Sequence, residues 1–197
     1  MNEEDIKFLR IDINGIGQLC CFLSVLEGFR DIGLFAINDY DSLGDDFFEK
    51  TWYNKETFPS NSDIINDIKQ LLEKDFPDYK TAPSWSNTLF FIYRKNKEED
   101  IKNFRENFID RQELFTPEFE RQLWLLLWYP KCCVEKHCSI PSNQRKPTKK
   151  ELESKRLIPF RKCSKNCSKE WVKEFKRIVD KYQLEDFVKK EKFVFDH

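Results

Sequence analysis

The sequence predicts an α+β fold, with a small α/β fold as the alternative, in which a few strands and several helices precede a helical tail. The chain has 197 residues, 40% of them hydrophobic, so folding can bury one substantial core. Apolar residues recur at strand spacing in some segments and at helical spacing in others. The resulting order of strand, helix, strand, helix, strand, helix, helix is typical of this fold class.

The first part of the chain is predicted to hold two strands and a helix. Ile6–Ile13 alternates apolar and polar residues and indicates a strand with a bulge near Leu9. Gln18–Phe29 places its apolar residues on one face and predicts a helix. Ile32–Ile37 is a short apolar run of strand length.

The middle of the chain is predicted to add a helix and a strand. Asp63–Phe76 follows helical spacing, with Ser62 or Asn61 as the cap and Pro77 as the stop. Thr88–Tyr93 has the composition of a buried strand.

Two further helices are predicted before residue 130. Lys97–Arg111 is weakly amphipathic. Thr116 and Pro117 form a strong helix start, because a hydroxyl cap precedes a proline at the first helical position. The helix that follows, Glu118–Tyr129, is apolar on most faces, so we expect it to be the central core helix. All five glycines lie in the first 44 residues, so later turns are expected to use Pro, Asn, Asp and Ser.

The tail contains the clearest amphipathic helix of the chain. Ser168 can cap it. Its apolar stripe consists of Trp171, Val172, Phe175, Ile178, Val179 and Tyr182. Such a stripe must be buried, most simply against the rest of the protein. Upstream, Thr148–Glu151 matches a capping box and predicts a short helix from about Lys149 to Arg156.

Charge divides the chain into two parts. Residues 1–130 hold 15 Lys/Arg and 25 Asp/Glu, a net charge of −10, whereas residues 131–197 hold 19 and 10, a net charge of +9. We therefore predict an acidic α+β body (1–130) and a basic, cysteine-bearing helical module (131–197) packed on it. The two parts either attract each other or bind different partners.

The chain has the features of a cytoplasmic protein without a membrane segment. Its first residues are acidic, unlike those of a signal peptide. The longest apolar run, Leu123–Tyr129, is far shorter than the roughly 20 residues that span a bilayer. In the cytosol the seven cysteines are expected to be reduced.

The cysteines of the tail are candidate ligands for a structural Zn²⁺. Zinc favours close pairs of soft ligands, because a short spacing places two of them on one edge of a tetrahedron. The predicted ligands are Cys133, Cys138, Cys163 and Cys167, with Cys132 and His137 as substitutes. One alternative is that these cysteines are thiols that bind no metal, and another is that they form a disulfide.

A basic stretch between the cysteine pairs suits a phosphate backbone, because Lys and Arg that neutralise phosphates release counterions. Its candidate nucleic-acid contacts are Arg145, Lys146, Lys149, Lys150, Arg161 and Lys162. The alternative is a solvated face or one docked on the acidic body.

The leading functional hypothesis is a non-enzymatic, inhibitor-type protein that binds a protein partner through acidic and aromatic residues. Acidic surface can imitate phosphate, as in immunity or anti-defence proteins. The candidate residues are Asp39, Asp41, Asp45, Asp46, Trp52, Tyr53 and Trp85. The alternatives are a nucleic-acid-binding accessory protein acting through residues 145–169 and a metal-dependent enzyme using carboxylates of Asp39–Asp46. No catalytic residue is predicted, because the only histidines are His137 and the final residue.

Overall fold

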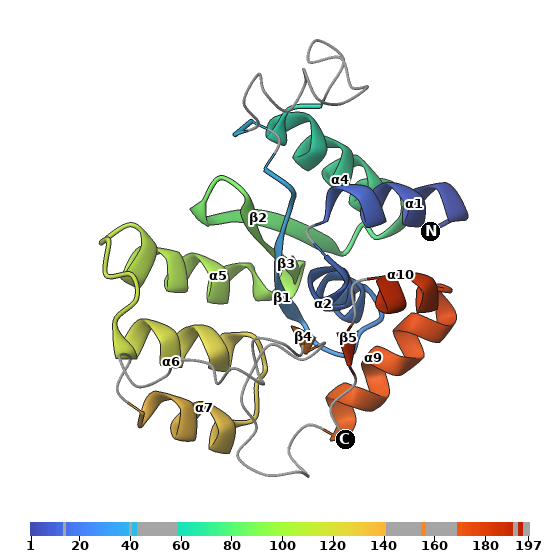
Figure 1. Ribbon diagram of the computed structural model, residues 1–197. Coiled ribbons are helices and arrows are strands. Elements are labelled where there is room, and N and C mark those ends of the chain that lie inside the picture. Colours follow the sequence, from blue (N-terminus) through green and yellow to red (C-terminus); the bar gives the residue numbers. More distant parts are fainter. Residues whose placement is uncertain are drawn as a thin grey trace.

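The computed structural model describes residues 1–13, 15–39, 41–42, 59–140, 155–156, 169–190 and 193–194. Its fold is α+β, as the sequence predicts: helices pack around a three-stranded antiparallel sheet (Figure 1). Among the described residues, no helix combines the length and the apolar character that crossing a membrane requires.

The described elements occur in the following order along the chain. The first six are α1 (Glu3–Asp12), α2 (Ile16–Leu26), β1 (Ile32–Ala36), α4 (Asn61–Asp75), β2 (Tyr79–Ser86) and β3 (Leu89–Arg94). They are followed by the 3-10 turn η2 (Lys95–Lys97), α5 (Glu98–Phe104), the π-helix η3 (Arg105–Ile109), α6 (Pro117–Leu126) and α7 (Lys131–Cys138). The last are β4 (Lys155–Arg156), α9 (Lys169–Lys181), α10 (Glu185–Lys190) and β5 (Phe193–Val194).

Most of the predicted elements are present, with ends that move by a few residues. The helices predicted at Gln18–Phe29, Asp63–Phe76, Lys97–Arg111 and Glu118–Tyr129 correspond to α2, α4, α5 with η3, and α6. The strands predicted at Ile32–Ile37 and Thr88–Tyr93 are β1 and β3. The cap of α4 is Ser60 rather than Ser62 or Asn61, because Ser60 and Asp63 form a reciprocal capping box.

The predicted strand at Ile6–Ile13 is wrong, because this segment is the helix α1. Asn2 caps the helix: its side chain accepts a hydrogen bond from the Asp5 N–H (2.8 Å), and its own N–H donates to the Asp5 carboxylate (2.7 Å). The buried residues Ile6, Leu9 and Ile13 are three and four positions apart, which is helical spacing. The capping box and this spacing together outweigh the local alternation.

The strand β2 was not predicted, because its sequence is polar and contains Pro83. The sheet order is β1-β3-β2, so β2 is an edge strand. An edge strand tolerates proline, because proline can occupy a position whose N–H would point away from the neighbouring strand. The register shifts between Pro83 and Ser86, which marks a local irregularity.

The central helix is α2, not α6 as predicted. Its buried residues are Ile16, Leu19, Cys20, Cys21, Phe22, Leu23, Ser24, Val25 and Leu26. Phe22 meets Phe35 of β1 edge-on, with ring centroids 5.0 Å apart. A side chain at Gly33 would lie 2.7 Å from the Val25 side chain, so glycine is required for α2 to approach β1 this closely. Within α6, only Phe119 and Leu123 are fully buried.

The sheet separates two helical layers. Its residues Phe35 and Phe90 lie on the face that α2 covers. Phe91 lies on the opposite face and meets Phe104 of α5, with ring centroids 5.9 Å apart. Figure 1 shows α5, α6 and α7 stacked on one side of the molecule, with α9 and α10 on the other side of α2.

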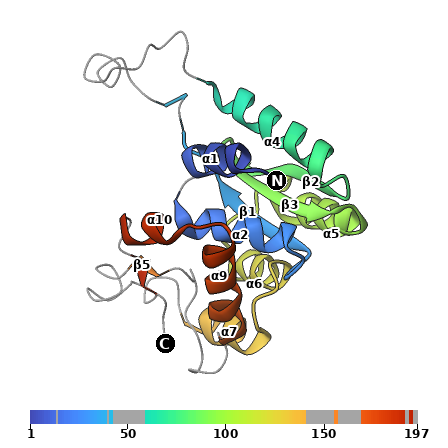
Figure 2. The same ribbon diagram turned by 90° about the vertical axis from the view of Figure 1, so that its right-hand side faces the viewer.

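The amphipathic tail helix is present as α9, and it packs against α2 (Figure 2). Its buried residues, which join the same core as α2, are Trp171, Phe175, Ile178 and Val179. Whether residues 131–197 form a module of their own stays a prediction. The short helix predicted at Lys149–Arg156 lies outside the described residues except for Lys155 and Arg156, which belong to β4.

A buried arginine lies beneath α9. Arg30 is 2% exposed; its Nε–H donates to the Ser24 hydroxyl and its Nη2–H to the Cys21 carbonyl, both at 2.8 Å. Its guanidinium lies 5.0 Å from the centre of the Trp171 ring, and Tyr129 stacks on the same ring at 4.9 Å. Among the described residues no Asp or Glu forms an ion pair with Arg30. Hydrogen bonds and a ring face therefore compensate this buried charge.

A second anchor holds the exposed edge of α9. Glu27, which caps α2, accepts hydrogen bonds from Arg177 (3.1 Å), from Lys181 (2.7 Å) and from the Tyr182 hydroxyl. Burial alone would raise the pKa of Glu27, but these hydrogen bonds outweigh burial and hold the pKa below its ordinary value of 4.5. A carboxylate of the body thus pairs with three side chains of the tail.

Replacing Trp171 by alanine should destabilise the fold by about 3 to 5 kcal/mol, because it opens a cavity and uncovers Arg30. Urea unfolding measures this loss. Lys173→Ala, an exposed site on the same helix, should change the free energy of unfolding by less than about 0.5 kcal/mol. Equal effects of the two variants would contradict the docking of α9 through Trp171.

The Glu27 cluster should make stability depend on pH. Because the folded-state pKa lies below the ordinary value, the cluster contributes stability above pH 4.5 and loses it as the pH falls through the folded-state pKa. We expect the difference in urea midpoint between wild type and Glu27→Gln to be largest at neutral pH and to shrink below pH 4.5. A difference that stays constant between neutral and strongly acidic pH would refute this assignment.

Candidate functional site

A groove of about 410 Å³ runs between α5–η3 and α6. Its apolar lining consists of Phe104, Phe108 and Leu126, and its polar lining of Asp100, Asn103, Asn107, Glu118 and Gln122. Among the described residues, neither Lys nor Arg lines this groove. The groove therefore combines apolar rings with amides and carboxylates.

Helical spacing creates both walls of the groove. On α5–η3 the lining residues Asp100, Asn103, Phe104, Asn107 and Phe108 recur every three or four positions, which places them on one side of the helix. On α6 the lining residues are four positions apart: Glu118, Gln122 and Leu126. This pattern is visible in the sequence, but it does not show that the two helices face each other.

The start of α6 is fixed by the residues that the sequence analysis identified. The Thr116 hydroxyl accepts a hydrogen bond from the Phe119 N–H (3.1 Å), and Pro117 occupies the first helical position. This cap directs Phe119 into the core, where it is 1% exposed. The cap therefore sets the position of α6 against α5.

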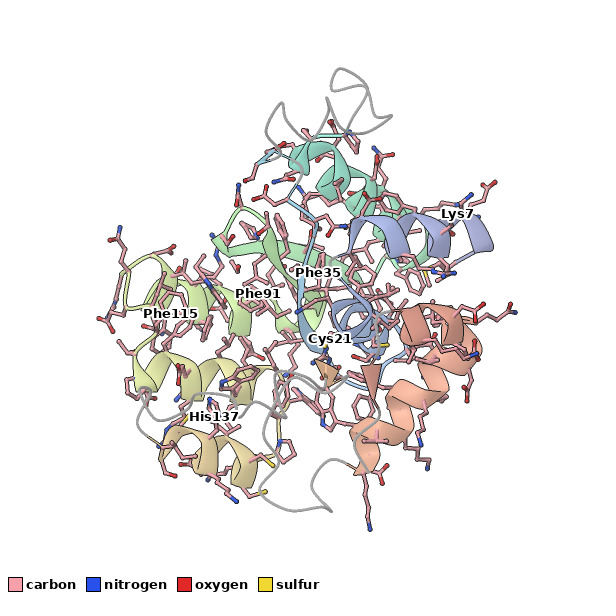
Figure 3. The ribbon with its side chains drawn as sticks, in the orientation of Figure 1. Lys7, Cys21, Phe35, Phe91, Phe115 and His137 are labelled. Atoms are coloured by element: carbon pink, nitrogen blue, oxygen red, sulfur yellow. The ribbon has the colours of Figure 1, made fainter. Side chains whose placement is uncertain are left out.

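A continuous series of aromatic contacts leads from the core to the surface beside the groove. Phe91 meets Phe104 (5.9 Å), Phe104 meets Phe119 (5.5 Å), and Phe119 meets both Phe115 (6.0 Å) and Trp85 (5.1 Å). Figure 3 shows Phe91 in the interior and Phe115 at the periphery, in the connection between α5–η3 and α6. The exposed ring is thus supported from below by buried rings.

Phe115 is 68% exposed, and its backbone has a φ of 62°. A bulky side chain in this left-handed region is uncommon, because it costs roughly 1–2 kcal/mol. Burial does not explain the residue, since most of its ring faces solvent. Backbone outliers of this kind are concentrated at binding and active sites.

A second strongly exposed aromatic residue in the described chain follows the opposite end of α6. Trp128 is 54% exposed, with a φ of 65°. Its N–H donates to the Leu125 carbonyl (3.0 Å), and the Tyr129 N–H donates to the Trp124 carbonyl (3.1 Å). These two bonds form the helix end that glycine usually supplies. Two exposed rings therefore flank α6.

Left-handed residues other than glycine also end the helices η3 and α9. Gln112 and Gln183 have φ values of 57° and 52°. The later turns were expected to use Pro, Asn, Asp and Ser, so glutamine and tryptophan in these positions correct that expectation. The physical reason is that hydrogen bonds to the helix end compensate the steric cost.

The carboxylates of the groove remain largely exposed. The Glu118 side chain is 59% exposed and accepts a hydrogen bond from Gln122 (2.7 Å). The Asp100 side chain is 49% exposed and pairs with Lys97 at 3.1 Å. Exposed pairs of this kind contribute little to stability, so they can exchange partners at small cost.

The residues predicted to bind a partner are not gathered at one place in the described chain. Trp85 is half-buried and contacts Phe119 and Phe115, so it lies beside the groove. Asp39 and Asp41 accept hydrogen bonds from the side chain (2.9 Å) and the backbone N–H (3.1 Å) of Asn61, at the start of α4. The others, Asp45, Asp46, Trp52 and Tyr53, lie outside the described residues.

The predicted zinc ligands are only partly described. Cys133 is buried and Cys132 exposed on the helix α7. Cys133 and His137 are four positions apart and share a face, whereas Cys138 lies further around the helix. No group of three metal-binding side chains occurs among the described residues. Cys163 and Cys167 lie outside them, so the zinc site stays a prediction.

The basic residues predicted to contact nucleic acid also lie outside the described part of the chain. They are Arg145, Lys146, Lys149, Lys150, Arg161 and Lys162.

Comparisons with protein-family models, with curated proteins and with solved structures found no match to this chain. The assignment of a function therefore depends on the groove and its surroundings.

Gln112 offers a test of the left-handed helix ends. Gln112→Gly should raise the free energy of unfolding by about 0.5 to 1 kcal/mol, because glycine adopts this conformation without a steric cost. Urea unfolding of the purified variant measures the change. A variant less stable than wild type would contradict the backbone conformation described for this helix end.

Proposed function

We propose that this protein is a non-enzymatic, inhibitor-type binding protein that engages a basic segment of a protein partner. The binding surface is the groove between α5–η3 and α6, together with Phe115 and Trp85 beside it. The observation that carries the proposal is Phe115, which is 68% exposed in a left-handed backbone conformation.

The aromatic part of this surface has the character of an interface centre. Aromatic residues are enriched at protein interfaces, and a few anchors carry most of the binding energy. Trp85 and Phe119 contact Phe115 and limit the movement of its ring. A ring that is already ordered loses little conformational entropy when a partner covers it.

The charge of the surface indicates the chemistry of the partner. Asp100 and Glu118 line the groove, whereas Lys97 and Arg121, which pair with them, lie outside its lining. These exposed pairs can be exchanged for a partner's cations at small cost. Residues 1–130 as a whole carry a net charge of −10. A partner with Lys or Arg beside apolar residues satisfies both the carboxylates and the rings. Proteins that handle nucleic acids have such basic surfaces, so blocking one of them in an immunity-like or anti-defence-like role suits this surface.

Phe115→Gly tests the proposal while it removes the backbone strain. A partner captured from cell extract is first identified and purified, and its affinity is then measured by calorimetry. We expect Phe115→Gly to weaken binding by about 30-fold, because an anchor ring is lost. Gln112→Gly, which makes the same backbone change in the same loop, should leave the affinity unchanged.

A pair of charge reversals tests the groove itself. Asp100→Lys and Glu99→Lys change the net charge equally, and both sites are exposed in the first turn of α5, but only Asp100 lines the groove. Asp100→Lys should weaken binding much more than Glu99→Lys. Equal effects of the two reversals, or a partner that binds Phe115→Gly as tightly as wild type, would refute the proposed surface. Duplex DNA bound with a steep salt dependence would favour the nucleic-acid alternative instead.

A further inference from the structure

A second hollow, of about 330 Å³, lies on another side of α5–η3, where the helix meets the sheet. Its volume is in the range of small-molecule sites. Strands β2 and β3 contribute Ala82 and Tyr93, and the helix contributes Ile101, Arg105 and the charged residues Glu98, Lys102, Glu106 and Asp110. Lys102 pairs with Glu106 at 4.0 Å. The site shares no lining residue with the groove proposed to bind a protein, and it does not depend on that proposal.

The Arg105 side chain lines this hollow and carries an unsatisfied donor. Its Nε is buried and has no hydrogen-bond partner. Among the described residues no carboxylate pairs with Arg105, although Glu106 and Asp110 line the same hollow. Buried polar atoms without partners are rare in folded proteins, and each calls for an explanation such as a missing ligand.

The backbone at Arg105 is unusual as well. Arg105 begins the π-helix η3, in which the Asp110 N–H donates to the Arg105 carbonyl at 2.9 Å. A π-turn inserted in an α-helix is rare and occurs frequently at functional sites. Here the irregular turn coincides with the unsatisfied Arg105 side chain.

Tyr93 contributes a second donor from the floor of the hollow. It is 5% exposed, and its hydroxyl forms no hydrogen bond within the described part of the chain. Burial, and then the neighbouring Glu98 carboxylate, raises the pKa of Tyr93, so the hydroxyl keeps its proton at neutral pH. Glu98 pairs with Lys80 through two contacts of 2.9 Å, and no hydrogen bond joins it to Tyr93.

We propose that this hollow binds a ligand that carries a carboxylate and, a few ångströms away, a cationic group. The carboxylate accepts hydrogen bonds from Arg105 and Tyr93. The cationic group faces Asp110 and Glu106, and it displaces Lys102 from its exposed pair with Glu106 at small cost. A simple anion would be repelled by these carboxylates, and a simple cation by Arg105. Free amino acids and the carboxyl terminus of a basic peptide share this chemistry.

Three probe compounds test the contribution of each charged group of the ligand. N-acetyl-lysine carries both the carboxylate and the ammonium group, N-acetyl-lysinamide lacks the carboxylate, and N-acetyl-norleucine lacks the ammonium group. Calorimetric titration of the full chain should give a Kd of about 1 mM or tighter for N-acetyl-lysine and values at least about tenfold weaker for the other two. Tighter binding of free lysine than of N-acetyl-lysine would identify a free amino acid, and the reverse a peptide terminus.

Two variants assign the binding to the named donors. Tyr93→Phe removes only the hydroxyl and should weaken N-acetyl-lysine about tenfold, because a hydrogen bond to a charged group is lost. Arg105→Leu should abolish binding without lowering Tm, since it removes a buried donor that has no partner. Arg111→Leu, at an exposed arginine outside the hollow, is the matched control and should bind normally. Absence of saturable binding, equal binding of the acid and the amide, or normal binding by Arg105→Leu would overturn the proposal.

Discussion

The structure depends on one constraint, which is that α2 has no polar face. A helix that is apolar all round cannot remain in contact with water, so other elements must cover every side of it. The sheet covers one side and α9 another, while α1 also contacts it. The glycine at position 33 and the ring of Phe22 allow the sheet to approach closely. The position of α9 follows from this burial.

Charged residues then determine how the covering helix is held. Arg30 is buried under Trp171, and Glu27 is surrounded by side chains of the tail. Part of the opposite charge of the body and the tail is therefore satisfied within the protein. The groove beside α6 differs, because its carboxylates stay largely exposed and its exposed ring has no cover. This contrast distinguishes a surface that serves folding from one that is available for binding.

Sequence patterns identified most of the elements because apolar spacing reflects burial directly, as in α4 and α9. These patterns failed where another interaction outweighed them. A capping box stabilises Ile6–Ile13 as a helix, and Pro83 is tolerated in β2 because β2 is an edge strand. The candidate sites were harder. The groove arises from two stripes on separate helices, and no local signal indicates that these stripes face each other. The π-helix at Arg105 also has no sequence signature, because it results from packing rather than from residue preference.

The position of α9 over α2 also bears on how the protein is made. Because a chain leaves the ribosome from its N-terminus, α2 emerges long before the helix that covers it. Until residues 169–181 follow, the side of α2 that α9 will occupy has no native cover. A partly synthesised chain thus displays an apolar surface of the kind that chaperones bind and that promotes aggregation. Completion of the fold must therefore wait until α9 has been synthesised.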